Sequence, residues 1–172
     1  MFSNPDNHDL PQLKLLSRAI KLDSIKNYKV QEMLQEINWV FQLSTQHKFL
    51  LPLQGAYFDP QSQILQIYMP QRVSLHTVLH SANYQPLSAL DKQLIATNLA
   101  KALLLLNKLK PGEVLAHSHI TSKNVFVNLT DFSVEIGDFG LPSLKKYCKL
   151  FHNYINFSNW SAPEIWQAQF KN

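Results

Sequence analysis

The spacing of apolar residues changes along the chain and predicts several elements in its first half. Residues 13–22 hold several apolar residues in a short run, which is typical of a strand. Residues 49–70 hold two apolar runs separated by Asp-Pro and Gln-Ser-Gln, which predicts two strands joined by a turn. Between these segments, residues 27–44 carry an apolar residue at every third or fourth position, the spacing of one helix face. These apolar residues are Val30, Met33, Leu34, Ile37, Val40 and Phe41.

The middle of the chain reads as two helices. A short one is expected over residues 74–80. A longer one is expected to begin at Ser88 or Asp91, because both side chains are good N-caps, and to end near Leu109, where Lys-Pro-Gly follows.

The pattern returns to strands in the last third. Residues 124–128 and 132–137 alternate between apolar and polar and are joined by Leu-Thr-Asp, which predicts a hairpin. The stretch from Asp138 to Trp160 mixes polar and aromatic residues without a clear period, and we expect a long surface loop there.

Composition indicates one globular domain. The chain has 172 residues, of which 45% are hydrophobic and 16% charged, and residues 1–12 are polar enough to be disordered. The single cysteine, Cys148, cannot form an internal disulfide, which favours a reducing, cytoplasmic location. There is no secretory signal pattern, and the most apolar stretch, residues 99–109, is too short to span a bilayer. The net charge of +4 is scattered, so we expect no nucleic-acid partner.

A series of motifs runs through these elements in a fixed order. The series is RAIKL, LQEINWV, IYMPQRVSLHTVLH, VLAHSHITSKNVFVN, VEIGDFG and WSAPEIW. It resembles a protein kinase domain of the tyrosine-kinase-like group, from about Leu15 to Trp166. The resemblance implies an α+β, two-lobe kinase-like fold, with residues 13–69 as part of the N-lobe and the hinge and residues 70–172 as part of the C-lobe.

The resemblance assigns an ion pair to the first two motifs. Lys21 corresponds to the lysine that holds the ATP phosphates, although a solvated lysine at a strand end is the plainer interpretation. Glu36 corresponds to the glutamate that pairs with this lysine. An alignment counted back from His47 and Gly55 places Asn38 there instead. We favour Glu36 because only a carboxylate forms the ion pair.

The resemblance also implies an adenine site. Ala19 would leave room above the ring, Gln66 stands at the gatekeeper position, and Tyr68 and Met69 would present backbone groups in the hinge. Phe126 would lie beneath the ring. Met69 and Phe126 are equally well explained as core residues.

The DFG segment implies a metal site. Asp138 would bind Mg²⁺ against the phosphates, and Asn124 would supply an oxygen to a second ion. The alternative is an ordinary Asp-Phe-Gly turn. Phe139 is expected to pack beneath the helix that carries Glu36 and against His117. ATP and Mg²⁺ are therefore the expected cofactors, bound weakly.

The catalytic loop departs from the family at its central position. The family's His-Arg-Asp reads here as His117, Ser118 and His119, so His119 replaces the aspartate that orients the substrate hydroxyl. Loss of a positioned acid or base typically costs about 10² to 10⁴ in rate. The loop is similar to that of integrin-linked kinase, a pseudokinase that also lacks this aspartate. Without the arginine, phosphorylation in the following loop is not expected to switch activity. The candidate positions there are Tyr147, Tyr154 and Ser158.

Further departures leave several interpretations open. The only glycines are Gly55, Gly112, Gly137 and Gly140, so a glycine-rich phosphate loop is missing and other chain segments are expected to complete the fold. We favour a catalytically impaired, pseudokinase-like signalling module with protein partners. The alternatives are an active atypical protein kinase, a non-functional fragment, and a zinc site. The zinc ligands would be His117, His119, Cys148 and His152.

Overall fold

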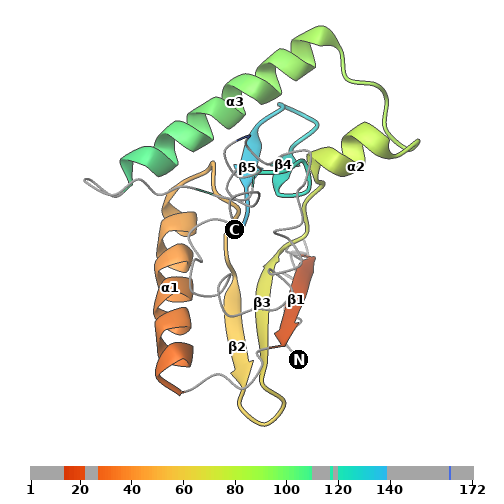
Figure 1. Cartoon of the computed structure of the whole chain (residues 1–172). Helices are drawn as coiled ribbons and strands as arrows, with labels where there is room; N and C mark the ends of the chain where they lie inside the picture. The colour runs from red at the N-terminus through yellow and green to blue at the C-terminus, as the bar shows by residue number, and fades with distance from the viewer. Residues whose placement is uncertain (1–13, 22–26, 110–116, 118–119, 139–162, 164–172) are drawn as a thin grey trace, which may run out of the picture.

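The computed structural model describes residues 14–21, 27–109, 117, 120–138 and 163, and its first unit is a three-stranded antiparallel sheet (Figure 1). The strands are β1 (Leu15–Lys21), β2 (Gly55–Asp59) and β3 (Ile64–Pro70), in the order β1-β3-β2. β1 and β3 bury part of their residues and β2 has none that is fully buried, as expected for a sheet with one covered face. The predicted strand and strand pair are confirmed.

Helix α1 (Asn27–Gln46) runs alongside this sheet (Figure 1). Four of the six apolar residues predicted to form one helix face are buried at helical spacing, whereas Leu34 and Phe41 are exposed, so the face is narrower than predicted. The four buried residues are Val30, Met33, Ile37 and Val40. They belong to the same hydrophobic core as Ile20 of β1 and Leu65 and Ile67 of β3, so the helix and the sheet are held together by apolar burial.

The connection from α1 to β2 differs from the prediction. The apolar run that begins at Phe49 was expected to start a strand, but the strand begins only at Gly55. The backbone of the run bonds instead to β5: the N–H of Leu51 donates to the carbonyl of Ile136 at 2.9 Å, and the N–H of Ile136 donates to the carbonyl of Phe49 at 2.9 Å. These two hydrogen bonds connect the segment before β2 to β5, in the second half of the molecule.

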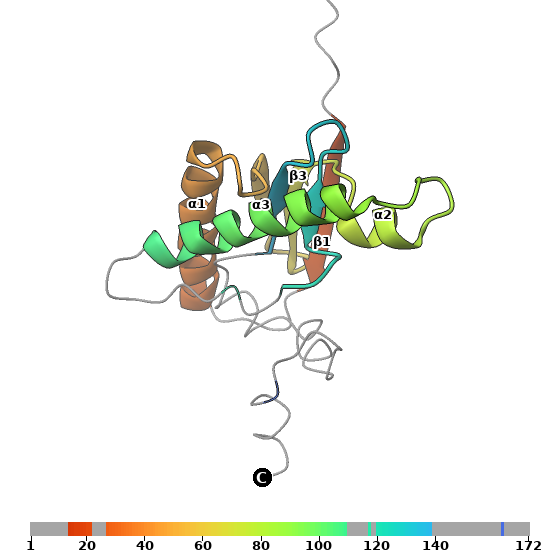
Figure 2. The same cartoon turned by 90° about the horizontal axis from the view of Figure 1, so that it is seen from above.

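The second half contains α2 (Leu75–His80), α3 (Ala89–Lys108) and the hairpin β4 (Val125–Val127) and β5 (Val134–Ile136). Helix α3 crosses the hairpin and contacts β5 (Figures 1 and 2). Its N-cap is Ser88, whose hydroxyl accepts from the N–H of Asp91 while the Asp91 carboxylate accepts from the N–H of Ser88. This capping box decides between the two starts that the sequence left open. Within the described part of the chain, no helix has the length and apolarity needed to cross a membrane.

Candidate functional site

The open end of the β4–β5 hairpin gathers three of the motif residues. The N–H of Gly137 donates to the carbonyl of Asn124 at 2.9 Å, which holds Asn124 beside the start of the DFG segment. His117 is buried, and its Nε2 lies 2.7 Å from the carbonyl oxygen of Gly137. Because a carbonyl oxygen can only accept, Nε2 must carry the proton. His117 therefore fixes the backbone next to Asp138.

Gly137 is where this part of the fold is most crowded. A Cβ at this position would lie 2.9 Å from Cε2 of Phe126 and 3.2 Å from Cδ2 of Leu51. The ring of Phe126 thus packs directly against the glycine backbone. Glycine is required here by the close approach of side chains, because any larger residue would displace one of them.

Asp138 forms an ion pair that sequence reasoning did not anticipate. Its Oδ1 lies 3.0 Å from Nη1 of Arg18, and the side chains of Asp138 and Arg18 are 11% and 34% exposed. The backbone of Asp138 has φ 62°, in the left-handed region that aspartate tolerates better than most residues. The structure thus brings the predicted metal ligand against a cation from β1.

The cation comes from one face of β1. Side chains alternate along a strand, so Arg18 and Ile20 lie on one face and Ala19 and Lys21 on the other. Ile20 is 1% exposed and belongs to the core shared with α1, whereas Ala19 and Lys21 are exposed. Among the described residues, no ion pair joins Lys21 to Glu36 or Asp138. Arg18 is therefore the residue of β1 that contacts Asp138, the contact expected of Lys21 by the motif resemblance.

Helix α1 places the two candidates for the glutamate position differently. Glu36 lies between Met33 and Val40 in the repeating pattern and is partly buried at the edge of the core-facing stripe. Asn38 is exposed. Helical geometry therefore directs Glu36, and not Asn38, toward the interior of this half of the molecule.

The segment predicted to act as a hinge lies within a strand ladder. Tyr68 and Met69 are paired with Ser17 and Leu16 of β1, and the N–H of Gln71 donates to the carbonyl of Lys14 at 2.7 Å. The carbonyl of Tyr68 accepts from the N–H of Gln54 at 2.8 Å. The backbone that was expected to meet adenine is thus engaged by neighbouring strands.

The side chain of Gln66 has a partner of its own. The hydroxyl of Tyr68 donates to Oε1 of Gln66, and both side chains are partly buried. The two residues are two positions apart on β3, so their side chains lie on the same face of the strand. This face is opposite to the one that carries Leu65 and Ile67 into the core.

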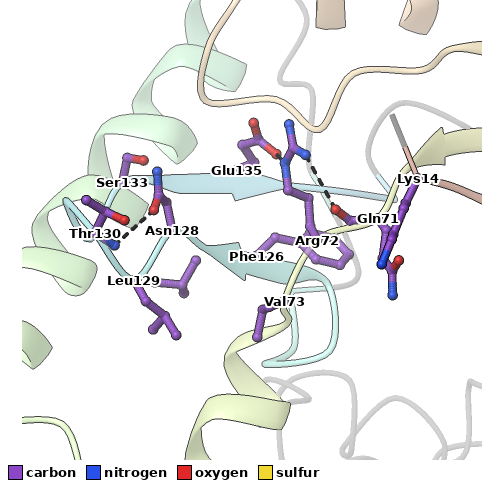
Figure 3. A pocket seen from close by; sticks show the side chains of 11 residues that line it. Lys14, Gln71, Arg72, Val73, Phe126, Asn128, Leu129, Thr130, Ser133 and Glu135 are labelled. Carbon is purple, nitrogen blue, oxygen red and sulfur yellow. Dashed lines mark hydrogen bonds and ion pairs between the residues drawn. The ribbon is translucent and has the colours of Figure 1, made fainter. Parts of the chain in front are cut away.

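A groove of about 710 Å³ lies between the segment after β3 and the β4–β5 hairpin (Figure 3). Phe126 lines it, together with apolar and polar residues from both sides. Arg72 reaches across to Glu135, with Nε 2.9 Å from Oε2 (Figure 3). Among the predicted site residues that the structure describes, only Phe126 contributes to the lining.

Several predicted residues lie outside the described part of the chain. They are Ser118, His119, Phe139, Tyr147, Cys148, His152, Tyr154 and Ser158. The replacement of the catalytic aspartate by His119, the packing of Phe139 and the zinc alternative therefore remain sequence-based predictions.

The arrangement around Asp138 does not fit a magnesium ion. Mg²⁺ prefers oxygen ligands at about 2.1 Å, which a carboxylate would provide. Oδ1 of Asp138 is instead 3.0 Å from a guanidinium nitrogen. A divalent ion on the same oxygen would lie within roughly 5 Å of that nitrogen, and the repulsion at an effective dielectric constant of about 20 would be about 6 kcal/mol. The pair would have to separate before this oxygen bound a metal ion.

Comparison with known proteins matches this geometry to one family. A family model of the protein kinase domain matches residues 12–171. The serine/threonine-protein kinase-like protein CCR4 of Arabidopsis thaliana is 31% identical over 98 residues, which cover 57% of this chain and 13% of that protein. The kinase domain of maize SIRK1 (sucrose-induced receptor kinase 1), solved with AMP-PNP bound, superposes with a TM-score of 0.68 and 25% identity. That match covers 89% of this chain and 53% of the maize chain, and it confirms the predicted fold.

Proposed function

Because the chain belongs to the protein kinase family, we propose that it is a kinase-like module with impaired phosphoryl transfer, which binds nucleotide weakly and acts through protein partners. The observation that carries this proposal is the contact between Arg18 and Asp138. Asp138 is the residue through which the family binds catalytic metal, and here its carboxylate meets a guanidinium at 3.0 Å.

Impairment follows from what phosphoryl transfer requires. The reaction depends on positioned cations that neutralise the charge on the transferred phosphoryl group and on a residue that orients the nucleophile. The Arg18 contact interferes with the first requirement, because the guanidinium competes with a metal ion for the Asp138 carboxylate. His119 replaces the residue that meets the second. A neutral imidazole can accept a proton, but it lacks the charge and the shape of a carboxylate.

Residual nucleotide binding is supported by the parts of the site that remain in place. The contacts of Asn124 and His117 with Gly137 keep the hairpin end ordered around Asp138. The maize relative holds a nucleotide analogue in the same fold. Binding is expected to be weak because β1 pairs with Tyr68 and Met69, whose backbone would otherwise be available to adenine.

The test is phosphoryl transfer by the purified chain from γ-labelled ATP, with Mg²⁺, to a generic protein substrate. Asp138→Asn is the matched control, because it removes the charge while keeping the shape. We expect incorporation by the native chain to equal that of the control, and His119→Asp alone not to raise it. Ordinary kinases turn over at about 1 to 100 s⁻¹. A rate in that range that disappears in Asp138→Asn would refute impairment and identify an active atypical kinase with His119 as its base.

A further inference from the structure

Arg18 has no role in the motif series, yet it is the residue of β1 that contacts Asp138. We propose that Arg18 is the counter-ion of Asp138. It balances the charge of Asp138, excludes a divalent metal ion from that carboxylate, and makes any nucleotide binding independent of Mg²⁺. The exclusion of metal stands on the geometry alone. The statement about nucleotide rests on the proposed function.

The contact has the properties of a lasting ion pair. The Asp138 side chain is largely buried, at 11% exposure, so solvent screens the carboxylate little. The planar guanidinium also matches the geometry of a carboxylate better than a lysine ammonium does. A hydrogen bond between two ionised groups is also shorter and stronger than one between neutral groups.

Both partners are held in place by the fold around them. Arg18 lies opposite Ile67 in the β1–β3 ladder and is two residues from Ile20, which is 1% exposed. Asp138 follows Gly137, whose N–H donates to Asn124 at 2.9 Å and whose carbonyl oxygen lies 2.7 Å from Nε2 of His117. Neither backbone can shift freely. The contact is therefore fixed by the fold and is not a transient contact between two mobile surface side chains.

The geometry also defines the form of ligand that suits the cleft. A carboxylate whose charge is balanced by arginine offers little to the metal ion of a nucleotide–Mg²⁺ complex. A planar guanidinium matches phosphate oxygens in geometry and charge. The free, metal-free nucleotide is therefore the expected ligand.

The chain offers a matched control in its second arginine–carboxylate pair. Arg72 and Glu135 meet at 2.9 Å, with side chains 39% and 25% exposed (Figure 3). The pair lines the groove beside the hairpin, and neither Arg18 nor Asp138 belongs to that lining, although Glu135 precedes Asp138 by only three residues. Arg72→Gln removes an arginine of similar exposure and the same charge without touching the proposed contact.

The first measurement uses Mn²⁺ alone as a paramagnetic probe of the amide NMR spectrum. In the native chain we expect no selective broadening of the Asn124 and Gly137 resonances. In Arg18→Gln these resonances should broaden selectively, and the effect should vanish in the double variant Arg18→Gln, Asp138→Asn. Arg72→Gln and Arg18→Lys should behave like the native chain. Their dispersed spectra would also show that loss of an arginine does not by itself unfold the protein.

Two outcomes overturn the exclusion of metal: selective broadening in the native chain that Asp138→Asn abolishes, or no gain of broadening in a folded Arg18→Gln variant. The second measurement titrates a fluorescent ATP analogue with Mg²⁺ and with EDTA. The native dissociation constants should agree within about twofold, which is within 0.4 kcal/mol. Binding that requires Mg²⁺ refutes metal independence. Absence of binding under both conditions refutes the proposed weak nucleotide binding, and the Mn²⁺ result still decides the role of Arg18.

Discussion

Replacing Gly137 by alanine should destabilise the protein, although it adds only one methyl group. The new Cβ would stand 2.9 Å from the ring of Phe126 and 3.2 Å from the side chain of Leu51. Both distances are shorter than the roughly 3.5 to 4.0 Å at which carbon atoms attract each other, so at least one neighbour must move. Gly137 itself is buried, and its backbone joins Asn124 and His117. Movement there would also disturb the hydrogen bonds that position Asp138.

The size of the effect is the difference between two contributions. Added atoms in a packed site cost about 1 to 3 kcal/mol. Replacing glycine by alanine gives back about 0.4 to 1 kcal/mol, because the unfolded chain loses conformational freedom. The difference between these two contributions spans roughly 0 to 2.6 kcal/mol, and its middle, about 1.3 kcal/mol, is the expected net loss in the free energy of unfolding. For a chain of this length, 1 kcal/mol corresponds to a shift in Tm of about 2 to 4 °C.

Gly55→Ala is the matched control, because a Cβ at Gly55 would meet nothing within 4 Å. The assay is urea unfolding of the native chain and the two variants, followed by circular dichroism. Gly137→Ala should lower the midpoint while leaving the slope of the transition unchanged. Gly55→Ala should be neutral or slightly stabilising. Equal midpoints for the two variants would refute the close packing described around Gly137.

Two further predictions concern single hydrogen bonds. Ser44 is buried and its hydroxyl accepts from the N–H of Leu53 at 3.0 Å, so Ser44→Ala should lower the unfolding free energy by about 1 to 3 kcal/mol; a urea midpoint equal to the native one would contradict this. The pKa of Asp59 is held below its usual range by the hydroxyl of Ser62 and a backbone N–H, so its contribution to stability is present near neutral pH and is lost as the pH falls through the folded-state pKa. Ser62→Ala should raise the Asp59 pKa in a carbon-detected NMR titration, and an unchanged value would show that the hydroxyl does not matter.

Much of the fold could be predicted from local pattern. The helix face of α1 followed from the spacing of Val30, Met33, Ile37 and Val40, because a period near 3.6 distinguishes a helix from a strand. The hairpin followed from alternation around Leu-Thr-Asp. The prediction for the run beginning at Phe49 was wrong because a buried apolar segment looks the same in sequence whether it forms a strand or only an isolated bridge to a distant strand.

The candidate site was harder to predict, because strand pattern does not say which face meets a partner. Alternation in β1 separates Arg18 and Ile20 from Ala19 and Lys21, but only packing against α1 decides which face is interior. A motif match pointed to Lys21. The sequence offered one indication of the interior face, the apolar Ile20. If Ile20 is buried, a residue two positions away, such as Arg18, lies on the same face.

The most direct test of this account is a double-mutant cycle on the unfolding free energy with Arg18→Gln, Asp138→Asn and both together. The side chains are 34% and 11% exposed, so the pair lies between a surface contact and a buried one. We expect a coupling energy of about 0.5 to 1.5 kcal/mol in favour of the native pair, reduced at high salt. The same cycle on Arg72 and Glu135 should give a smaller value, because both of these side chains are more accessible to water than Asp138. A coupling of zero between Arg18 and Asp138 would contradict the claim that the aspartate at the family's metal-binding position is held here by an arginine.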